Sequence, residues 1–525
     1  MLVYGDHTEI ADPRERLASL SRGLESLARM PAGIVRHAAL VGILIDAGQL
    51  QQGMEDEGCE SPELGAFVYA LAAAVVRSSD SDYAQLGELP ILAPMDLPSS
   101  IELRLPEGFA FYAVYPEQFI AAARRLELRG PARVIGIRSI GTTLGAIVAA
   151  TLGVPQPITV RPCGDPFART VDLPPGTIAD DAHYVIVDEG PGLSGSSFGA
   201  VADWLEMRGV PLERIAFVPS HSGDLGPQAS VAHRGRWERA QRVAASFDPA
   251  FLCSIFGQLE PFSTGGPRER LKYLADDEGG RLLLKFAGLG DIGARKLEMA
   301  RALYAAGFAP EPVGLVHGFI VERWIGDGEP LARGNKPVEE IGRYIGARAK
   351  LFPAPAASGA SIKQLLAMCR RNISLALGGQ VAGCLGQCDV GELQARVVRV
   401  RTDNKLDRHE WLRTRGGRLI KTDALDHHEA HDLIGCQDAA WDIAGAIVEF
   451  ELDGAAVETL IAATGLDVDR RLLEFYRLSY AAFRLGQATL AAEMASTATA
   501  GEIHRYRRLL LQSNTLLRDS AQILV

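Results

Sequence analysis

Short apolar segments alternate with helix-like segments from about residue 109 to 250, and this alternation limits the fold more than any other feature of the sequence. The apolar segments have the length and composition of strands, and they read FAFYAVY, ARVIGI, PITVRP, HYVIVDE and RIAFVPS. Strands that alternate with helices predict a parallel α/β sheet with right-handed crossovers. Because such sheets bind ligands beyond the carboxyl ends of their strands, we expect a binding site there.

One of these strands leads into a turn rich in glycine and serine, at Val185–Ser197 (VIVDEGPGLSGSS). Asp188 and Glu189 at the strand end can accept hydrogen bonds from a vicinal diol. Glycines let backbone N–H groups approach a phosphate closely, and the start of the following helix adds partial positive charge. The turn residues expected to bind the phosphate are Gly192, Ser194, Gly195, Ser196 and Ser197. The pattern predicts a ribose 5-phosphate site, with an ordinary strand-to-helix turn as the alternative.

A second strand, turn and helix start occur at 134–146 (VIGIRSIGTTLGA). Arg138 supplies positive charge for a phosphate, and the expected hydrogen-bond donors are Ser139, Gly141, Thr142 and Thr143. Two such turns, separated by one strand–helix–strand unit, are stronger evidence for a phosphate-binding site than either turn alone. The alternative for this segment is a helix N-cap turn. Arg161 and Arg169 either contact the same ligand or are solvated surface arginines.

The two turns together resemble the type I phosphoribosyltransferase family over about 110–245. Asp188 and Glu189 match its acidic pair, Ser194–Ser197 match its phosphate loop, and 134–146 resembles its pyrophosphate loop. The resemblance implies that 5-phosphoribosyl 1-diphosphate and Mg²⁺ bind here, and that a nitrogen nucleophile reacts at the anomeric carbon, with Asp188 and Glu189 as catalytic residues. The loop around Gly190–Leu193 is one residue longer than is usual in that family.

The composition of the chain limits the kinds of molecule that we expect it to bind. The 525 residues carry a net charge of −11, which argues against broad binding to nucleic acid or to an anionic membrane. The seven cysteines are scattered without a CxxC pair, and MLVYGDHTEI is no signal peptide, so we expect a cytoplasmic protein. Residues 1–108 form a predicted helical extension, either a cap or a homodimer surface.

A different pattern begins near residue 255. The apolar strand LLLKF carries Lys285, with a glycine-rich turn before it at 263–266 and a helix containing Glu298 after it. A buried lysine that pairs with a helical glutamate is typical of a site for nucleotide phosphates. An edge-strand lysine is the alternative. The remainder, about 336–525, has mostly helical patterns.

This second region resembles the kinase-like fold, in its aminoglycoside phosphotransferase branch, over about 255–525. Lys285 and Glu298 match the phosphate-binding pair, Asp403 in VRTDNKLDRHEWL matches the catalytic base, and Asp423 in GRLIKTDALDHHEAH matches the magnesium ligand. Phe319–Ile325 resembles the hinge between lobes, and Asp442 a structural aspartate. The chain departs from the family at Arg401-Thr402, where His-Gly is usual, and at His409, which replaces an asparagine.

The densest group of histidines and aspartates follows, and it offers a second interpretation. His427 and His431 are four residues apart, so a helix would align them as transition-metal ligands. The other members of this cluster are His428, Asp423, Asp426 and Asp432. Asp426 could also replace Asp423 as the magnesium ligand. A cluster of surface histidines is the other alternative.

The sequence as a whole predicts an α/β multi-domain protein. We expect a helical extension at 1–108, a phosphoribosyltransferase-like domain at 109–250 and an α+β bilobal kinase-like domain at 255–525. The predicted function is phosphoribosyl transfer in nucleotide or nucleoside-like metabolism, with a fused phosphotransferase that uses ATP and Mg²⁺. The alternative is a non-catalytic sensor of a phosphoribosyl ligand fused to a pseudokinase.

Overall fold

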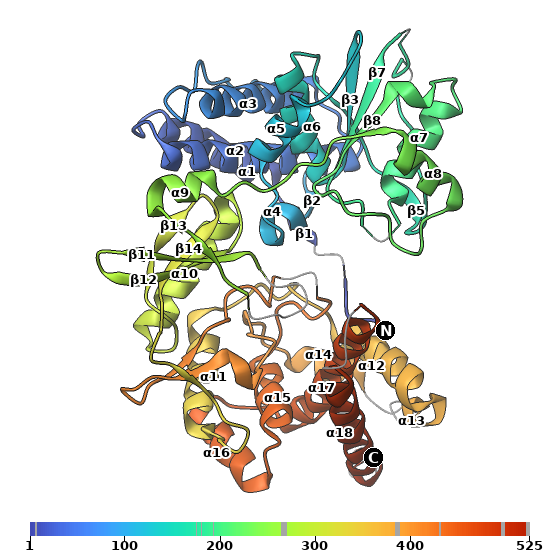
Figure 1. The fold of residues 1–525 in the computed structure, drawn as a ribbon. Helices are drawn as coiled ribbons and strands as arrows, with labels where there is room; N and C mark the ends of the chain where they lie inside the picture. Colours follow the sequence, from blue (N-terminus) through green and yellow to red (C-terminus); the bar gives the residue numbers. More distant parts are fainter. Residues whose placement is uncertain are drawn as a thin grey trace.

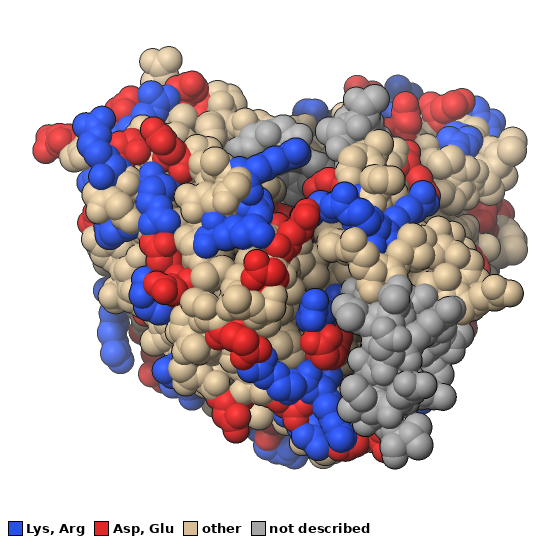
Figure 2. All heavy atoms as spheres, turned by 90° about the horizontal axis from the view of Figure 1, so that it is seen from below, with Lys and Arg blue, Asp and Glu red and all other residues tan. Residues whose placement is uncertain are grey.

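The computed structural model describes residues 1–5, 8–174, 176–179, 181–192, 194–263, 270–383, 389–429, 432–494 and 499–520. Figure 1 shows a parallel sheet with covering helices at one end, an antiparallel sheet in the middle and a mainly helical lobe at the other end. No helix among the described residues is long and apolar enough to cross a membrane. On the face seen in Figure 2, basic and acidic side chains are interspersed.

The parallel sheet has five strands in the order β4-β3-β7-β8-β9, and every neighbouring pair is parallel. Its strands are β3 (Ala132–Ile137), β4 (Ile158–Val160), β7 (His183–Val187), β8 (Ile215–Val218) and β9 (Gln241–Arg242). The connecting helices are α6 (Ile140–Leu152), α7 (Ser196–Glu206) and α8 (Val231–Arg239). The predicted parallel α/β core is therefore confirmed, although the segment FAFYAVY, expected to be a strand, is not one: its first three residues end the short helix α4 (Glu107–Phe111) and the rest is irregular.

The first hundred residues cover this sheet. They form α1 (Pro13–Leu27), α2 (Ile34–Asp56) and α3 (Pro62–Asp80), with β1 (Thr8–Ala11) paired antiparallel to β2 (Ile101–Arg104). Asp12 and Ser61 cap α1 and α3 by accepting backbone N–H groups with their side chains. One apolar core joins α2, α3, α5 (Pro116–Ala123), α6 and the antiparallel sheet, so these helices are a layer of the molecule rather than a separate extension.

The middle part matches the predicted β-rich lobe with one helix. Its antiparallel sheet has the order β10-β11-β12-β14-β13. The elements are α9 (Ala250–Phe256), β10 (Glu260–Pro261), β11 (Lys272–Asp277), β12 (Gly280–Phe286), α10 (Gly290–Ala305), β13 (Pro312–Val316) and β14 (Phe319–Arg323). Most of the predicted hinge is strand β14, and the chain leaves it at Trp324 toward the helical lobe.

The helical lobe packs around Trp411, Trp441, Tyr476 and Tyr480, all fully buried. Its helices are α11 (Val338–Leu351), α12 (Ile362–Leu377), α13 (Gly379–Gly383), α14 (Val390–Arg396), α15 (Ala439–Phe450), α16 (Gly454–Thr464), α17 (Arg470–Met494) and α18 (Thr499–Ser520). Its strands are β15 (Glu329–Pro330), β16 (Trp411–Arg413) and β17 (Leu419–Lys421). Outside this lobe, the hairpin of β5 (Cys163–Asp165) and β6 (Ala168–Thr170) follows β4 of the parallel sheet in the chain.

Candidate functional sites

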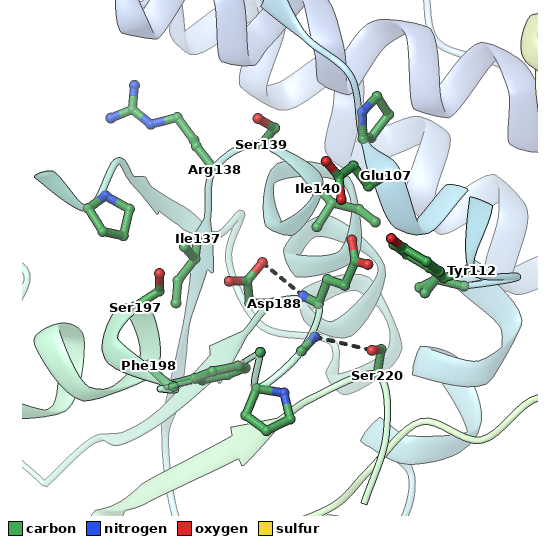
Figure 3. A pocket seen from close by; sticks show the side chains of 18 of the residues that line it. Glu107, Tyr112, Ile137, Arg138, Ser139, Ile140, Asp188, Ser197, Phe198 and Ser220 are labelled. Carbon is green, nitrogen blue, oxygen red and sulfur yellow. Dashed lines mark hydrogen bonds between the residues drawn. The ribbon is translucent and has the colours of Figure 1, made fainter. Parts of the chain in front are cut away.

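A cavity of about 980 Å³ lies beyond the carboxyl ends of β3 and β7. Both predicted turns line it, together with Glu107 and Tyr112 from the α4 segment and His221 after β8. Figure 3 shows the carboxylates of Asp188 and Glu107 pointing into the same space, while the Arg138 side chain points away from Asp188. The position of the cavity is the one expected for a ligand of a parallel sheet.

The acidic pair faces this cavity without a cationic hydrogen-bond partner among the described contacts. Glu189 Oε2 accepts the Gly108 N–H at 2.8 Å, and Asp188 Oδ1 accepts the Glu189 N–H at 2.8 Å. Burial raises the pKa of Asp188 well above its usual range. Burial and the nearby Glu107 carboxylate raise the pKa of Glu189 to about 8. Both groups would gain from a ligand that brings positive charge or hydrogen-bond donors.

The glycine- and serine-rich turn borders the cavity next to the acidic pair. Gly192, Ser194, Gly195, Ser196 and Ser197 all line it, whereas Leu193 is outside the described residues. Helix α7 begins at Ser196, so its free N–H groups point toward the cavity end of the helix. Gly195 has φ +63°, and a Cβ there would lie 2.5 Å from Leu225 Cδ2, so only glycine fits.

The second turn contributes only part of its predicted residues. Arg138 and Ser139 line the cavity, but Gly141, Thr142 and Thr143 do not. Those three residues are buried inside the first turn of α6, where Thr143 packs so closely on Gly48 of α2 that a Cβ at Gly48 would overlap its hydroxyl. The small residues expected to bind a ligand therefore pack the helix against its neighbours.

Two arginines at the cavity are held by acidic residues of α2, a contact that the sequence did not indicate. Arg138 Nη1 lies 3.2 Å from Asp56 Oδ1 and 3.6 Å from Glu55 Oε2. Arg161 forms an ion pair with Asp56 and donates to the Arg138 carbonyl at 2.7 Å. Since the paired residues are about a hundred positions apart in the chain, no local spacing could have revealed the contact.

A second group of charged residues lies where the antiparallel sheet meets the helical lobe. Its members are Lys285, Asp403, Glu410, Lys421, Asp423 and His427. Lys285 Nζ of β12 lies 3.2 Å from Asp423 Oδ1, which is 138 residues further along the chain. Burial disfavours the charged lysine, but Asp423 and Glu322 outweigh it and raise the pKa of Lys285 above its usual range. The structure thus brings together two residues predicted to belong to one nucleotide site.

Glu298 is not the partner of Lys285, which corrects the prediction. Its side chain is 70% exposed and bonds to Arg301 on the same face of α10. The residue of α10 that points inward is Lys296, whose Nζ is buried 3.8 Å from Asp426 Oδ2. Burial, reinforced by Arg270 and Lys285, lowers the pKa of Lys296 to about 8. The helical period fixes this outcome, because 296 and 298 lie on different faces of the helix.

Asp403, the predicted catalytic base, is fully buried. It accepts hydrogen bonds from Tyr344 Oη at 2.5 Å and lies 3.3 Å from Lys421 Nζ and 3.1 Å from His427 Nδ1. Burial alone would raise its pKa, but Lys421, with help from His427, holds the pKa well below its usual range. Asp442 accepts the backbone N–H of Asp403 at 2.8 Å.

Among the described residues, Glu410, Asp423 and His427 bring three metal-ligating atoms within 4.8 Å of one another. Glu410 therefore lies where His409 was predicted, and His409 is exposed. Lys421 Nζ lies 2.6 Å from Glu410 Oε2, between that carboxylate and Asp403.

The other residues of the predicted histidine cluster lie elsewhere. Asp426 pairs with Arg270 at 3.0 Å, and His428 is buried with neither ring nitrogen hydrogen-bonded in the described residues. Neither His431 nor the expected glycine-rich turn beyond Ser263 is part of the described chain.

No protein-family model matches the chain, and no curated protein matches it. Among solved structures, a choline kinase from Streptococcus pneumoniae is similar over 51% of this chain and 97% of its own, at 16% identity and a TM-score of 0.39. An aminoglycoside phosphotransferase from Alicyclobacillus acidocaldarius is similar over 51% and 93%, at 13% identity and a TM-score of 0.36. The functional assignment therefore depends on the side-chain geometry of the chain itself.

Proposed function

We propose that the cavity beyond β3 and β7 binds 5-phosphoribosyl 1-diphosphate and transfers its phosphoribosyl group to a small nucleophile. The observation that carries the proposal is the position of Asp188 and Glu189, which face the same cavity as the turn that starts α7. An acidic pair for a diol and a helix N-terminus for a phosphate are the two recognition elements that a ribose 5-phosphate needs.

Each part of the cavity has a role in this proposal. Ser194–Ser197 and the first N–H groups of α7 hold the 5-phosphate. Asp188 and Glu189 accept hydrogen bonds from the ribose hydroxyls and stabilise the positive charge that develops at the anomeric carbon. Arg138 and Arg161 lie at the edge of the cavity, where a diphosphate would need positive charge.

The residues of the cavity fit a magnesium ion that arrives with the substrate. Mg²⁺ prefers oxygen ligands and is usually held by one or two carboxylates together with substrate phosphates. Asp188 and Glu189 supply such carboxylates without a lysine or arginine bonded to them among the described residues. When bound, the ion would neutralise the departing diphosphate.

For the second group, we infer a nucleotide site in which Asp403 does not act as the base. Lys285 would hold nucleotide phosphates, and Asp423 and Glu410 would hold Mg²⁺. Asp423 is 38% exposed, so a ligand can reach it, whereas Asp403 is completely enclosed by Tyr344, Lys421 and His427. The burial of Asp403 favours a nucleotide-binding module without phosphoryl transfer, and this is the second candidate function.

Calorimetry with 5-phosphoribosyl 1-diphosphate and Mg²⁺ tests the first proposal. We expect wild type to bind, and Asp188→Asn/Glu189→Gln to lose at least about 100-fold in affinity, because two hydrogen-bonded carboxylates are removed at about 1.5–3 kcal/mol each. Glu238→Gln, an exposed change on α8 outside the cavity, is the matched control and should bind as wild type does. A wild-type protein that gives no binding heat and no thermal shift would overturn the proposal.

A further inference from the structure

Three buried side chains from distant parts of the chain meet between the helical layer and the antiparallel sheet. They are His37 of α2, Glu117 of α5 and His317 in the turn between β13 and β14. In Figure 1 this turn belongs to the sheet below α2 and α5. The group lies apart from both sites described above, and none of its members lines the large cavity.

The three side chains converge on one point. Glu117 Oε1 lies 2.6 Å from His37 Nε2 and 2.7 Å from His317 Nε2, and all three ligating atoms fall within 4.8 Å of one another. Both histidine side chains are nearly unexposed, and Glu117 is 22% exposed, which leaves a way in for a small ion. The second oxygen, Glu117 Oε2, is buried and has no hydrogen-bond partner in the described part of the chain.

Other residues hold the two imidazoles in position. His37 Nδ1 lies 2.9 Å from Ser78 Oγ, so a proton on Nδ1 can be donated to this hydroxyl and leaves the Nε2 lone pair facing Glu117. On the other side, Tyr115 Oη donates to the His317 carbonyl at 2.6 Å. His317 has φ +39°, a conformation that is uncommon for a residue with a side chain.

The surroundings explain why the arrangement needs a cation. The rings of Tyr83, Tyr115 and Phe251 pack against the histidines with centroids 4.7 to 5.2 Å away. A carboxylate in such an apolar shell is costly unless it is paired with positive charge or coordinates a metal. Two imidazoles and a carboxylate oxygen are a ligand set found in three-ligand zinc sites, and Oε2 or a water can complete the coordination.

We propose that His37, Glu117 and His317 bind one divalent transition-metal ion, with zinc as its best candidate, and that this ion fastens the β13–β14 turn to helices α2 and α5. The ligands come from two helices of the helical layer and from a turn of the antiparallel sheet, so the metal joins parts of the chain that are otherwise held by apolar packing and hydrogen bonds. Imidazole suits zinc, and the affinity of such a site for first-row metals rises toward the end of the series.

The test uses the full chain, freed of metal with a chelator and then titrated with Co²⁺ or Zn²⁺. Native mass spectrometry should show one ion that is lost from His37→Gln and from His317→Gln, and Co²⁺ should give the visible absorption of a low-coordinate nitrogen and oxygen site. Ser78→Ala keeps all three ligands and should weaken binding about 10–100-fold, since it removes the partner that orients His37. Circular dichroism checks that each variant is folded.

Two further variants separate this site from the second group of charged residues. His427→Gln removes a potential ligand there and should leave the ion bound at His37, Glu117 and His317. His221→Gln, at the large cavity, should also have no effect. If folded wild type binds neither ion, or if His427→Gln abolishes binding while His317→Gln does not, the proposal is wrong and Glu117 simply accepts hydrogen bonds from the two histidines.

Discussion

The pKa values of two carboxylates in the cavity are shifted in the opposite direction from those of two carboxylates in the second group of charged residues. In the cavity, burial raises the pKa of Asp188 and Glu189, and no lysine or arginine hydrogen-bonds to either group in the described contacts. In the second group, Lys285 and Lys421 outweigh the effect of burial and lower the pKa of Asp423 and Asp403. Asp188 and Asp423 each come one or two residues after a strand, so position in the fold alone does not distinguish the two sets.

The difference shows what each set of carboxylates is available for. A buried carboxylate without an internal cation gains free energy when a ligand supplies a proton, a metal ion or a hydroxyl group. A carboxylate that is fully enclosed together with a buried lysine, as Asp403 is with Lys421, has less to gain, and its charge stabilises the fold instead. We therefore expect the cavity to take up a ligand, and the pair of Asp403 and Lys421 to stabilise the fold.

The largest expected effect comes from breaking that internal pair. Lys421→Met leaves the buried carboxylates of Asp403 and Glu410 without their cation, and we expect it to lower the free energy of unfolding by about 3–5 kcal/mol. Urea denaturation followed by circular dichroism measures the change. Lys350→Met, on the exposed end of α11, should stay within about 0.5 kcal/mol of wild type.

The double variant Lys421→Met/Asp403→Asn sharpens this prediction. Removing both charges eliminates one of the uncompensated carboxylates, so the double variant should recover part of the lost stability. A double variant that is less stable than the sum of the single changes would show that Asp403 is held by Tyr344 and His427 rather than by Lys421.

A smaller effect is expected from pH. Because Glu189 has a pKa of about 8 in the folded chain, it is mostly neutral at pH 7, and a ligand that requires its carboxylate must first displace the proton. The titration of Glu189 should therefore strengthen the binding of 5-phosphoribosyl 1-diphosphate with Mg²⁺ about tenfold between pH 7 and pH 9. Calorimetry across this range measures the change.

The same group has the opposite effect on the ligand-free protein. Its pKa is raised above the ordinary value of 4.5, so its contribution to stability is lost as the pH rises from about 4.5 through 8.

Glu189→Gln should flatten the pH dependence of binding. Nucleotide binding at Lys285 should change less from pH 7 to 9, because the pKa of Asp423 is low and that of Lys285 is high, and Lys296, with a pKa of about 8, pairs with Asp426 instead. Equal slopes at both sites would contradict the comparison.

The sequence predicted the parallel sheet and the position of its cavity, because both follow from local patterns. Apolar strands alternate with helices in 132–218, and the acidic pair and the Gly/Ser turn follow β7 directly. The β-rich lobe and the helical lobe were predicted for the same reason. The turn at Gly136–Thr143 was only partly predictable, since small residues serve helix packing as readily as phosphate binding.

Contacts between distant segments could not be predicted. Neither Asp56 beside Arg138 nor Lys421 beside Asp403 is marked by spacing, and the group of His37, Glu117 and His317 spans 280 positions of the chain. Glu410 left a weak signal, as an acidic residue immediately before strand β16, but the resemblance drew attention to His409 instead. Tertiary packing decides which of two neighbouring charged residues points inward.

The smallest expected effect concerns helix α10. It tests whether Glu298 belongs to the nucleotide site, as the kinase resemblance implies, or lies outside it, as its exposed position indicates. Glu298→Ala should leave the binding of a fluorescent ATP analogue with Mg²⁺ unchanged, because the side chain is solvated and pairs only with Arg301 among the described residues. Lys285→Met, the matched change at the site itself, should weaken binding about 10–100-fold by removing a hydrogen-bonded charge worth about 1.5–3 kcal/mol. If Glu298→Ala weakens binding as much as Lys285→Met does, α10 must rotate when nucleotide binds, and the inward position of Lys296 belongs to the ligand-free form only.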